Sequence, residues 1–358
     1  MIRTWILFLG AALLLTGRAW AMAPDLPPEL ALEAPEAASM VDPEAPDLGV
    51  GQGLRTLWSK AGGELRHQLL SGMGSVAALL AGVTLLGVVE SLVQDRGGRM
   101  GRYVDTVGAL WITAVSAGDV TALMGLGQRT ITEISQLSKV LLPAIAMSTA
   151  ASGGVTSASV RQVAAVFFSD VLLTLMERVL LPGVYIYIGL AAADAVLGSG
   201  QMEPLGKLVK RVIVWGLCGL LTLFTGYITV SGAVAGAVDA HAVRAAKSAM
   251  SAAVPVVGRI LSQAAETLLA GAGILRGMVG VFGALGVVGL CLAPVLRLGC
   301  QYFLYQGASL LSATVGPGPL TKLLSRLGDA FGLLFAMTAS SAAVILISLV
   351  SSLTAVMP

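Results

Sequence analysis

Two long stretches of this chain contain no charged residue. One covers residues 212–238, 27 residues in all, and the other covers residues 330–357. A helix needs about 20 consecutive apolar residues to cross the hydrocarbon core of a bilayer. Because backbone polar groups in lipid must be satisfied within a helix or a closed barrel, the two stretches predict membrane-spanning helices.

The composition of the whole chain agrees with a membrane protein. Of its 358 residues, 56% are hydrophobic and 12% are charged, against about 25% charged in soluble domains. The formal net charge is +2 and no basic stripe is present, so we expect no nucleic-acid partner. Cys218, Cys291 and Cys300 lie in apolar segments without CxxC spacing, so we assign them to packing and expect no metal or cofactor.

The first 53 residues divide into two segments. Arg3, an apolar run over residues 5–15 and the small-x-small pattern Ala19-Trp20-Ala21 predict a signal peptide over residues 1–21, cleaved or retained as an anchor. Residues 22–53 are acidic and proline-rich, which predicts a disordered segment outside the cytoplasm. That segment is either a solvated linker or a docking strip for a basic partner.

The remaining chain predicts an amphipathic helix followed by a helical transmembrane domain. Apolar residues share one helical face over residues 54–71, and the transmembrane domain covers residues 72–358. Residues 95–102, "DRGGRMGR", and the cluster Lys207, Lys210 and Arg211 are basic. Short basic loops stay in the cytoplasm, so we expect both there and residues 24–70 outside. The fold class is therefore all-α and polytopic, with about five to seven transmembrane helices and additional interfacial helices.

Three regions predict irregular helices. Residues 140–160 contain no charged residue, but their second half is polar and glycine-rich. This composition indicates a broken or re-entrant segment. Residues 162–198 are apolar but contain Pro182 and the pair Glu177-Arg178, and fit one kinked helix or two short ones. Residues 239–266 are mixed in character around Pro255 and predict a helical connection lying along the bilayer.

Glycines recur in the apolar segment "GAGILRGMVGVFGALGVVG" at residues 271–289. In a membrane helix each missing side chain lets a neighbouring backbone approach closely, so the glycines predict packing surfaces. Their neighbours are either other helices of this chain or, in part, another subunit, which includes a second copy of the same chain. The candidates are the repeat at every third residue and two pairs with small-xxx-small spacing: Gly277, Gly280, Gly283, Gly286 and Gly289, with Gly273-x-x-x-Gly277 and Gly232-x-x-x-Gly236.

Ionisable residues inside apolar segments are candidates for function because charge is costly in a membrane. Arg276 either extends to the interface or pairs with Asp170 or Glu177. Broken helices and intramembrane acids are also typical of secondary transporters, which keeps a transporter or permease as the alternative function. The charged candidates are Asp105, Asp119, Asp170, Glu177, Asp194 and Arg276.

An enzyme has no support in the sequence. The chain lacks the HExxH, P-loop and GxSxG patterns, and its two histidines, His67 and His241, are far apart. We therefore expect no catalytic residues.

Three strings carry a resemblance to a known family: "TGYITVSG" at residues 225–232, "AVPVVGRILSQAAETLLAGAG" at 253–273 and "APVLRLGCQY" at 293–302. They resemble the stage III sporulation protein AE family, and a weaker likeness extends from about residue 54 to the carboxyl end. The resemblance implies a membrane component of the channel-like apparatus that joins mother cell and forespore in endospore formation. It further implies a place in the mother-cell membrane around the forespore, other membrane proteins of the stage III complex as partners, and no enzymatic activity.

Overall fold

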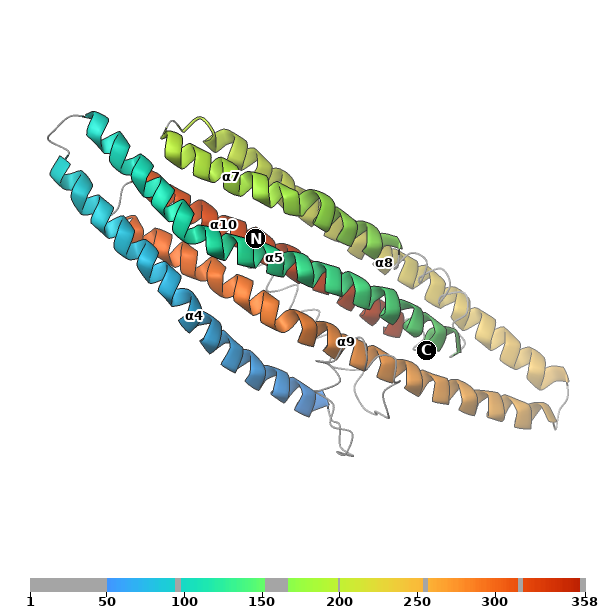
Figure 1. Ribbon diagram of the computed structural model, residues 1–358. Helices are drawn as coiled ribbons and strands as arrows, with labels where there is room; N and C mark the ends of the chain where they lie inside the picture. The colour runs from blue at the N-terminus through green and yellow to red at the C-terminus, as the bar shows by residue number, and fades with distance from the viewer. Residues whose placement is uncertain are drawn as a thin grey trace.

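The computed structural model describes residues 50–93, 98–151, 167–198, 200–253, 257–314 and 318–354. All regular structure in these residues is helical (Figure 1). The elements are α4 (Val50–Val93), α5 (Gly98–Ala151), the π-helical segment η2 (Met176–Leu180), α7 (Leu181–Leu197), α8 (Glu203–Ala253), α9 (Val257–Ser312) and α10 (Gly318–Thr354). Six helices among the described residues are long and apolar enough to span a membrane. The predicted all-α polytopic membrane fold, with five to seven spans, is therefore confirmed.

The helices form an elongated bundle in which consecutive helices run in opposite directions (Figure 1). The α4–α5, α7–α8 and α9–α10 connections consequently lie at the same end of the bundle, which we call the turn end. The central helix is α10, which packs against α5, α7, α8 and α9. In their most apolar windows, 67% of the α10 residues are buried but only 17% of those in α4 and α8. The two outer helices therefore have the broadest surfaces for lipid.

The core of the bundle follows from helical spacing along α10. Leu320, Leu324, Leu327, Phe331 and Leu334 recur at intervals of three or four residues and are all buried. This spacing places them on one side of a helix with 3.6 residues per turn. The ring of Phe331 meets the ring of Tyr305 edge to face at a centroid distance of 4.8 Å, which joins α10 to α9.

The first described helix is longer than the sequence indicates. α4 runs without interruption from Val50 to Val93, so the predicted amphipathic helix over residues 54–71 and the first span are parts of one helix. Gly62, Gly63, Gly72 and Gly74 lie within it. Glycine lowers helix stability in water by about 1 kcal/mol, but at none of these four positions does it end the helix.

The region around Pro182 forms one helix with a local widening. Residues 167–175 are α-helical and continue through η2 into α7, with Pro182 in the first turn of α7. Proline lacks an N–H and its ring displaces the carbonyl four residues earlier. In η2 the Leu181 N–H bonds to the Met176 carbonyl, five residues back, as in a π-helix. Of the two predicted alternatives, the structure therefore has a single irregular helix.

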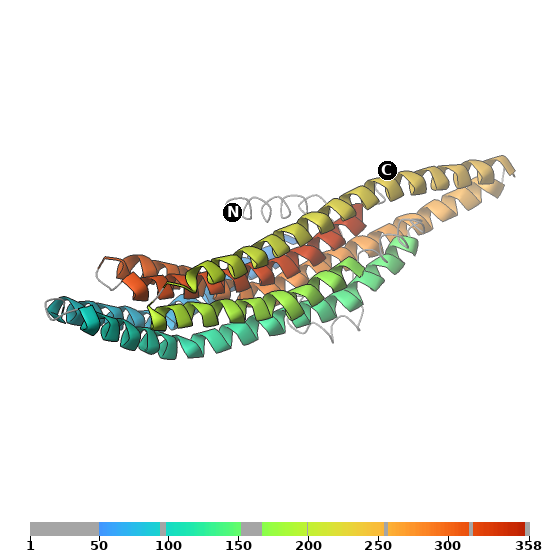
Figure 2. The ribbon, with the colours of Figure 1, turned by 90° about the horizontal axis from the view of Figure 1, so that it is seen from above.

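Two regions predicted to be irregular are regular helix where the structure describes them. Residues 140–151 continue α5 as regular helix with Pro143 inside it, while residues 152–160 lie outside the described part. Residues 239–253 extend α8, and residues 257–266 begin α9, so neither is a separate connecting helix. Alanine-rich sequence favours helix over a break. Figure 2 shows these ends of α8 and α9 reaching beyond the other helices.

Glycines at several helix contacts leave no room for a side chain. A Cβ built on Gly283 of α9 would lie 2.6 Å from Leu141 Cδ1 and 2.9 Å from Leu349 Cδ1. Gly286 and Gly289 are also buried. The positions Gly232, Gly236, Gly273, Gly277 and Gly280 are helical, but their surroundings lie outside the described part of the chain.

A further glycine pair, absent from the sequence-based candidates, lies on α10. A Cβ on Gly332 would lie 2.8 Å from the Tyr302 ring, and one on Gly328 would lie 3.2 Å from the Gln306 amide nitrogen. Gly328-x-x-x-Gly332 has the small-xxx-small spacing of close membrane-helix contacts. These glycines let α10 approach α9 closely.

Candidate functional site

A group of charged side chains gathers near the turn end, between α7, α8 and α10. We call it the charged cluster, and it consists of Asp194, Glu203, Lys207, Lys210, Lys322, Arg326 and Asp329. Four cations therefore face three carboxylates within an otherwise apolar bundle. The cost of burying charge makes this the strongest candidate site among the described residues.

A tight turn brings the ends of α7 and α8 to the cluster. Gly198, at φ 60°, caps α7 in the left-handed conformation, and its N–H bonds to the Asp194 carbonyl at 3.0 Å. Gly200 is also left-handed, at φ 66°, and its carbonyl accepts the Glu203 N–H at 3.4 Å. Glycine adopts this conformation without a Cβ clash. The chain thus reverses within a few residues, and Asp194 comes to lie beside the start of α8.

Asp194 is the most buried member of the cluster. Its carboxylate accepts a hydrogen bond from Arg326 Nη1 of α10 at 2.8 Å and another from the Met202 backbone N–H at 3.0 Å. The side chains of Arg326 and Asp194 are 16% and 8% exposed. Removing one partner of a buried ion pair typically costs about 3–5 kcal/mol, because the other charge is left uncompensated.

Glu203 connects three cations from two helices. Its carboxylate lies 3.3 Å from Arg326 Nη2, 2.6 Å from Lys207 Nζ and 3.7 Å from Lys322 Nζ. Lys207 is one helical turn further along α8, whereas Arg326 and Lys322 belong to α10. The first residue of α8 is therefore held to α10 by charge.

Asp329 forms the second half of the cluster. Its Oδ2 lies 2.6 Å from Lys210 Nζ and accepts a hydrogen bond from the Tyr187 hydroxyl at 3.4 Å. Its Oδ1 accepts one from Gln306 Nε2 at 3.2 Å. Asp329 therefore joins α10 to α7, α8 and α9.

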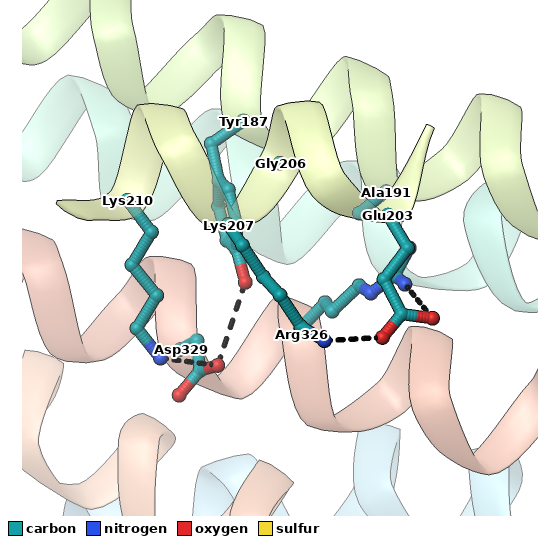
Figure 3. Close-up of a pocket in the computed structure, with 8 residues that line it drawn as sticks. All are labelled: Tyr187, Ala191, Glu203, Gly206, Lys207, Lys210, Arg326 and Asp329. Atoms are coloured by element: carbon teal, nitrogen blue, oxygen red, sulfur yellow. Dashed lines mark hydrogen bonds and ion pairs between the residues drawn. The ribbon is translucent and has the colours of Figure 1, made fainter. Parts of the chain in front are cut away.

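A pocket of about 150 Å³ opens between the two halves of the cluster (Figure 3). In this view the side chains of Lys210 and Tyr187 meet Asp329, and those of Lys207 and Arg326 meet Glu203. Gly206 leaves room there, since a Cβ on it would be 3.8 Å from the Tyr187 ring. The complete lining is Tyr187, Ala191, Glu203, Gly206, Lys207, Lys210, Arg326 and Asp329.

The chemistry of this lining is that of fixed charges. It offers ammonium and guanidinium donors beside carboxylate acceptors, without a cysteine, serine or histidine nucleophile. Among the described residues, no group of three or more His, Cys, Asp or Glu side chains is placed to hold a metal ion. The arrangement suits holding helices together or binding a charged group.

Asp119 of α5 forms hydrogen bonds to two side chains of α9, away from the charged cluster. Its Oδ2 accepts hydrogen bonds from the Tyr305 hydroxyl at 2.9 Å and from Gln301 Nε2 at 3.0 Å. Tyr305 is fully buried and Gln301 is 7% exposed. This carboxylate ties α5 to α9.

The other predicted acids are separate from one another. Asp170 forms an exposed ion pair with Lys139 at 3.5 Å, and Glu177 accepts a hydrogen bond from the Thr132 hydroxyl at 3.5 Å. Asp105 differs, because its Oδ1 is buried and has no hydrogen-bond partner among the described residues. The surroundings of Arg276 lie outside the described part of the chain. Of the six predicted charged candidates, only Asp194 belongs to the charged cluster.

Most of the charged cluster is absent from the sequence-based predictions, which place Lys207 and Lys210 in a basic loop and include no charge of α10. One signal for the cluster is nevertheless present in the sequence. Lys322, Arg326 and Asp329 follow one another at intervals of four and three residues. Such spacing places three charges on one face of an otherwise apolar helix, which predicts a buried polar contact.

Comparison with known proteins identifies the family. The family model described as stage III sporulation protein AE matches residues 47–355. Stage III sporulation protein AE of Bacillus subtilis (strain 168) is 22% identical over 293 residues, which cover 81% of this chain and 73% of that protein. No solved structure matches. The matched region includes every residue of the charged cluster, and the chain belongs to the stage III sporulation protein AE family.

Proposed function

We propose that this multi-pass membrane protein is a non-enzymatic component of the channel-like apparatus between mother cell and forespore. We place it in the mother-cell membrane around the forespore, together with other membrane proteins of the stage III complex. Membership of a stage III sporulation family over residues 47–355 and six helices able to span a membrane support this proposal. A second copy of the chain is a further candidate partner.

One observation favours an assembly component over a transporter: intramembrane acids bond across helices. Asp119 bonds to α9, Asp194 to α10, and Asp170 and Glu177 to α5. A carboxylate that carries a proton or an ion must change its partners during each transport cycle. Carboxylates used as contacts between helices instead keep one arrangement, which suits a scaffold.

The experiment compares spore yield with protein abundance. Asp119→Asn, Asp170→Asn and Asp194→Asn variants would each replace the original copy in a spore-forming host. If the acids only hold helices together, spore yield should follow the amount of protein in the membrane, and partners should still co-purify with whatever protein remains. Asp170→Asn should be the mildest of the three, because its ion pair with Lys139 lies on the outside of the bundle and does not join buried side chains.

Loss of spores at normal abundance and normal partner recovery would contradict the assembly role. Asp105 best distinguishes the assembly role from the transporter alternative. Its Oδ1 is buried without a hydrogen-bond partner among the described residues, which favours the transporter. Under the assembly proposal, Asp105→Asn should sporulate normally. A transporter that uses this carboxylate should lose function at full protein abundance.

A further inference from the structure

The outer face of α5 changes from apolar to polar along its length. Its exposed large apolar side chains begin with Tyr103, Val107 and Leu110, and none follows over residues 111–144. The exposed positions there are first small and then, as far as Lys139, polar. At about 100° per residue the polar ones fall on one side of the helix. We call this set the polar face, and it consists of Thr121, Gln128, Arg129, Glu133, Gln136 and Lys139.

Two contacts place the polar face level with the helix that contains η2. Lys139 Nζ lies 3.5 Å from an oxygen of Asp170, and the Thr132 hydroxyl donates a hydrogen bond to Glu177 at 3.5 Å. The side chains of Lys139 and Asp170 are 62% and 52% exposed, so this ion pair lies at the surface of the bundle. Residues 132–139 of α5 are therefore level with residues 170–177.

The other side of the bundle at this depth belongs to α8. The ring of Phe168 lies 4.6 Å from the ring of Tyr227, and a Cβ on Gly216 would lie 3.4 Å from Leu180 Cδ2. Residues 216–227 of α8 are thus level with residues 168–180, and through them with the polar face. Figure 2 shows α5 along one edge of the bundle and α8 along the other.

At this depth α8 is apolar where α5 is polar. Trp215 and Leu223 are 73% and 70% exposed, and α8 has no charged residue over residues 212–238, so this surface suits lipid. The polar face lies within Tyr103–Ala144, which is also long and apolar enough to span a membrane. Charged side chains in spans face the protein interior or a water-filled cavity. The bundle therefore has lipid at α8 and a different neighbour at the polar face.

The composition of the polar face favours water over a protein as that neighbour. The buried centres of protein interfaces are rich in aromatic residues and poor in lysine and glutamate. Residues 112–144 of α5 contain no aromatic residue, whereas Glu133 and Lys139 are both exposed. Taking charges of either sign out of water carries a desolvation penalty, which contact with water avoids.

We propose that the polar face of α5 lines a water-filled passage through the membrane, open to small hydrophilic solutes. Asp170 and Glu177 continue this lining onto the neighbouring helix. Other subunits must separate the polar face from lipid, so the inference rests on the proposed place in a membrane complex. In that complex α8 faces outward, toward the bilayer.

The test compares how fast single cysteines react with a charged, water-soluble thiosulfonate reagent. In a full chain without native cysteines, Gln128→Cys and Gln136→Cys place a thiol on the polar face. Trp215→Cys and Leu223→Cys place one on α8 at matching depth. Membranes from sporulating cells are opened so that the reagent reaches both surfaces. The polar-face thiols should react at least about tenfold faster, because the reactive thiolate forms poorly in apolar surroundings.

Two outcomes would overturn the proposal. Equally fast reaction on α5 and α8 would place this depth outside the membrane. Slow reaction at all four positions would mean that a protein partner covers the polar face. Labelling after denaturation gives the total thiol of each variant, and Thr121→Cys on the same face replaces a glutamine variant that fails to accumulate in the membrane.

A separate measurement on the same membranes addresses the proposed function. Other membrane proteins of the stage III complex should co-purify with each variant. Their absence would contradict the proposed place in the apparatus, whereas the ratio of reaction rates alone decides whether the polar face meets water.

Discussion

At the scale of single residues, some of the described glycines allow side chains of neighbouring helices to approach the helix backbone closely. Gly283 is in contact with Leu141 of α5 and Leu349 of α10, so at this position the neighbours belong to the same chain. In contrast, a Cβ on Gly226 of α8 would meet nothing within 4 Å. The same residue type therefore has different roles on a buried helix and on an outer one.

We expect Gly283→Leu to destabilise the bundle. The added side chain would overlap two leucines, and overpacking of this kind costs about 1–3 kcal/mol. The amount of folded protein in the membrane should fall, and Gly283→Ala should have a smaller effect in the same direction. Gly226→Leu is the matched control and should leave abundance unchanged. Equal abundance of Gly283→Leu and Gly226→Leu would show that close contact at Gly283 does not matter.

At the scale of helices, the charged cluster holds the α7–α8 hairpin against α10. Asp194 and Glu203 lie on either side of the hairpin turn, and Arg326 bonds to both. Because α8 is the more exposed helix of the pair, apolar burial fixes its position less than it fixes that of α10. Polar contacts therefore supply much of the specificity of this docking.

The Asp194–Arg326 pair should show strong coupling in a double-mutant cycle. Asp194→Asn and Arg326→Gln should each lower stability by about 3–5 kcal/mol, because each leaves the other charge buried. The double variant should be more stable than the sum of the single effects indicates. Thermal unfolding of the purified protein in one lipid mixture would measure all three. Strict additivity of the two changes would exclude the pair as a structural contact.

Sequence reasoning predicts the helices better than the contacts between them. Charge-free runs such as residues 212–238 identify spans directly, because length and hydrophobicity are local properties. The continuation of α5 through Pro143 was missed, because proline in a membrane helix is tolerated when neighbours satisfy the freed backbone groups. The pairing of Asp194 with Arg326 joins residues 132 positions apart. Helix packing decides which acid meets which cation, and no local pattern contains that information.

At the scale of the whole molecule, six spans place the start of α4 and the end of α10 on the same side of the membrane, opposite the turn end. The two predicted cytoplasmic basic segments lie at the start of α5 and in the first turns of α8, and both helices begin at the turn end (Figure 1). Lys322 and Arg326 of α10 lie near the same end. Basic residues favour the cytoplasmic side, so we expect the turn end in the cytoplasm.

This orientation can be measured by labelling single cysteines with an impermeant reagent. In a background without native cysteines, Lys60→Cys near the start of α4 should be labelled from the extracytoplasmic side of intact membranes. Arg99→Cys at the start of α5 should be labelled only after permeabilisation. The opposite pattern would invert the topology. Labelling of both positions in intact membranes would mean that α4 does not span the bilayer.

The central position of α10 has a consequence for how the protein is made. α10 is the last described helix to leave the ribosome, yet it packs against four of the others. Arg326 emerges 132 residues after Asp194, which at about 5–20 residues per second is a delay of roughly 7–26 s. During translation Asp194 therefore lacks its Arg326 partner for that time. The nascent bundle therefore remains open, and its last-synthesised described helix closes it.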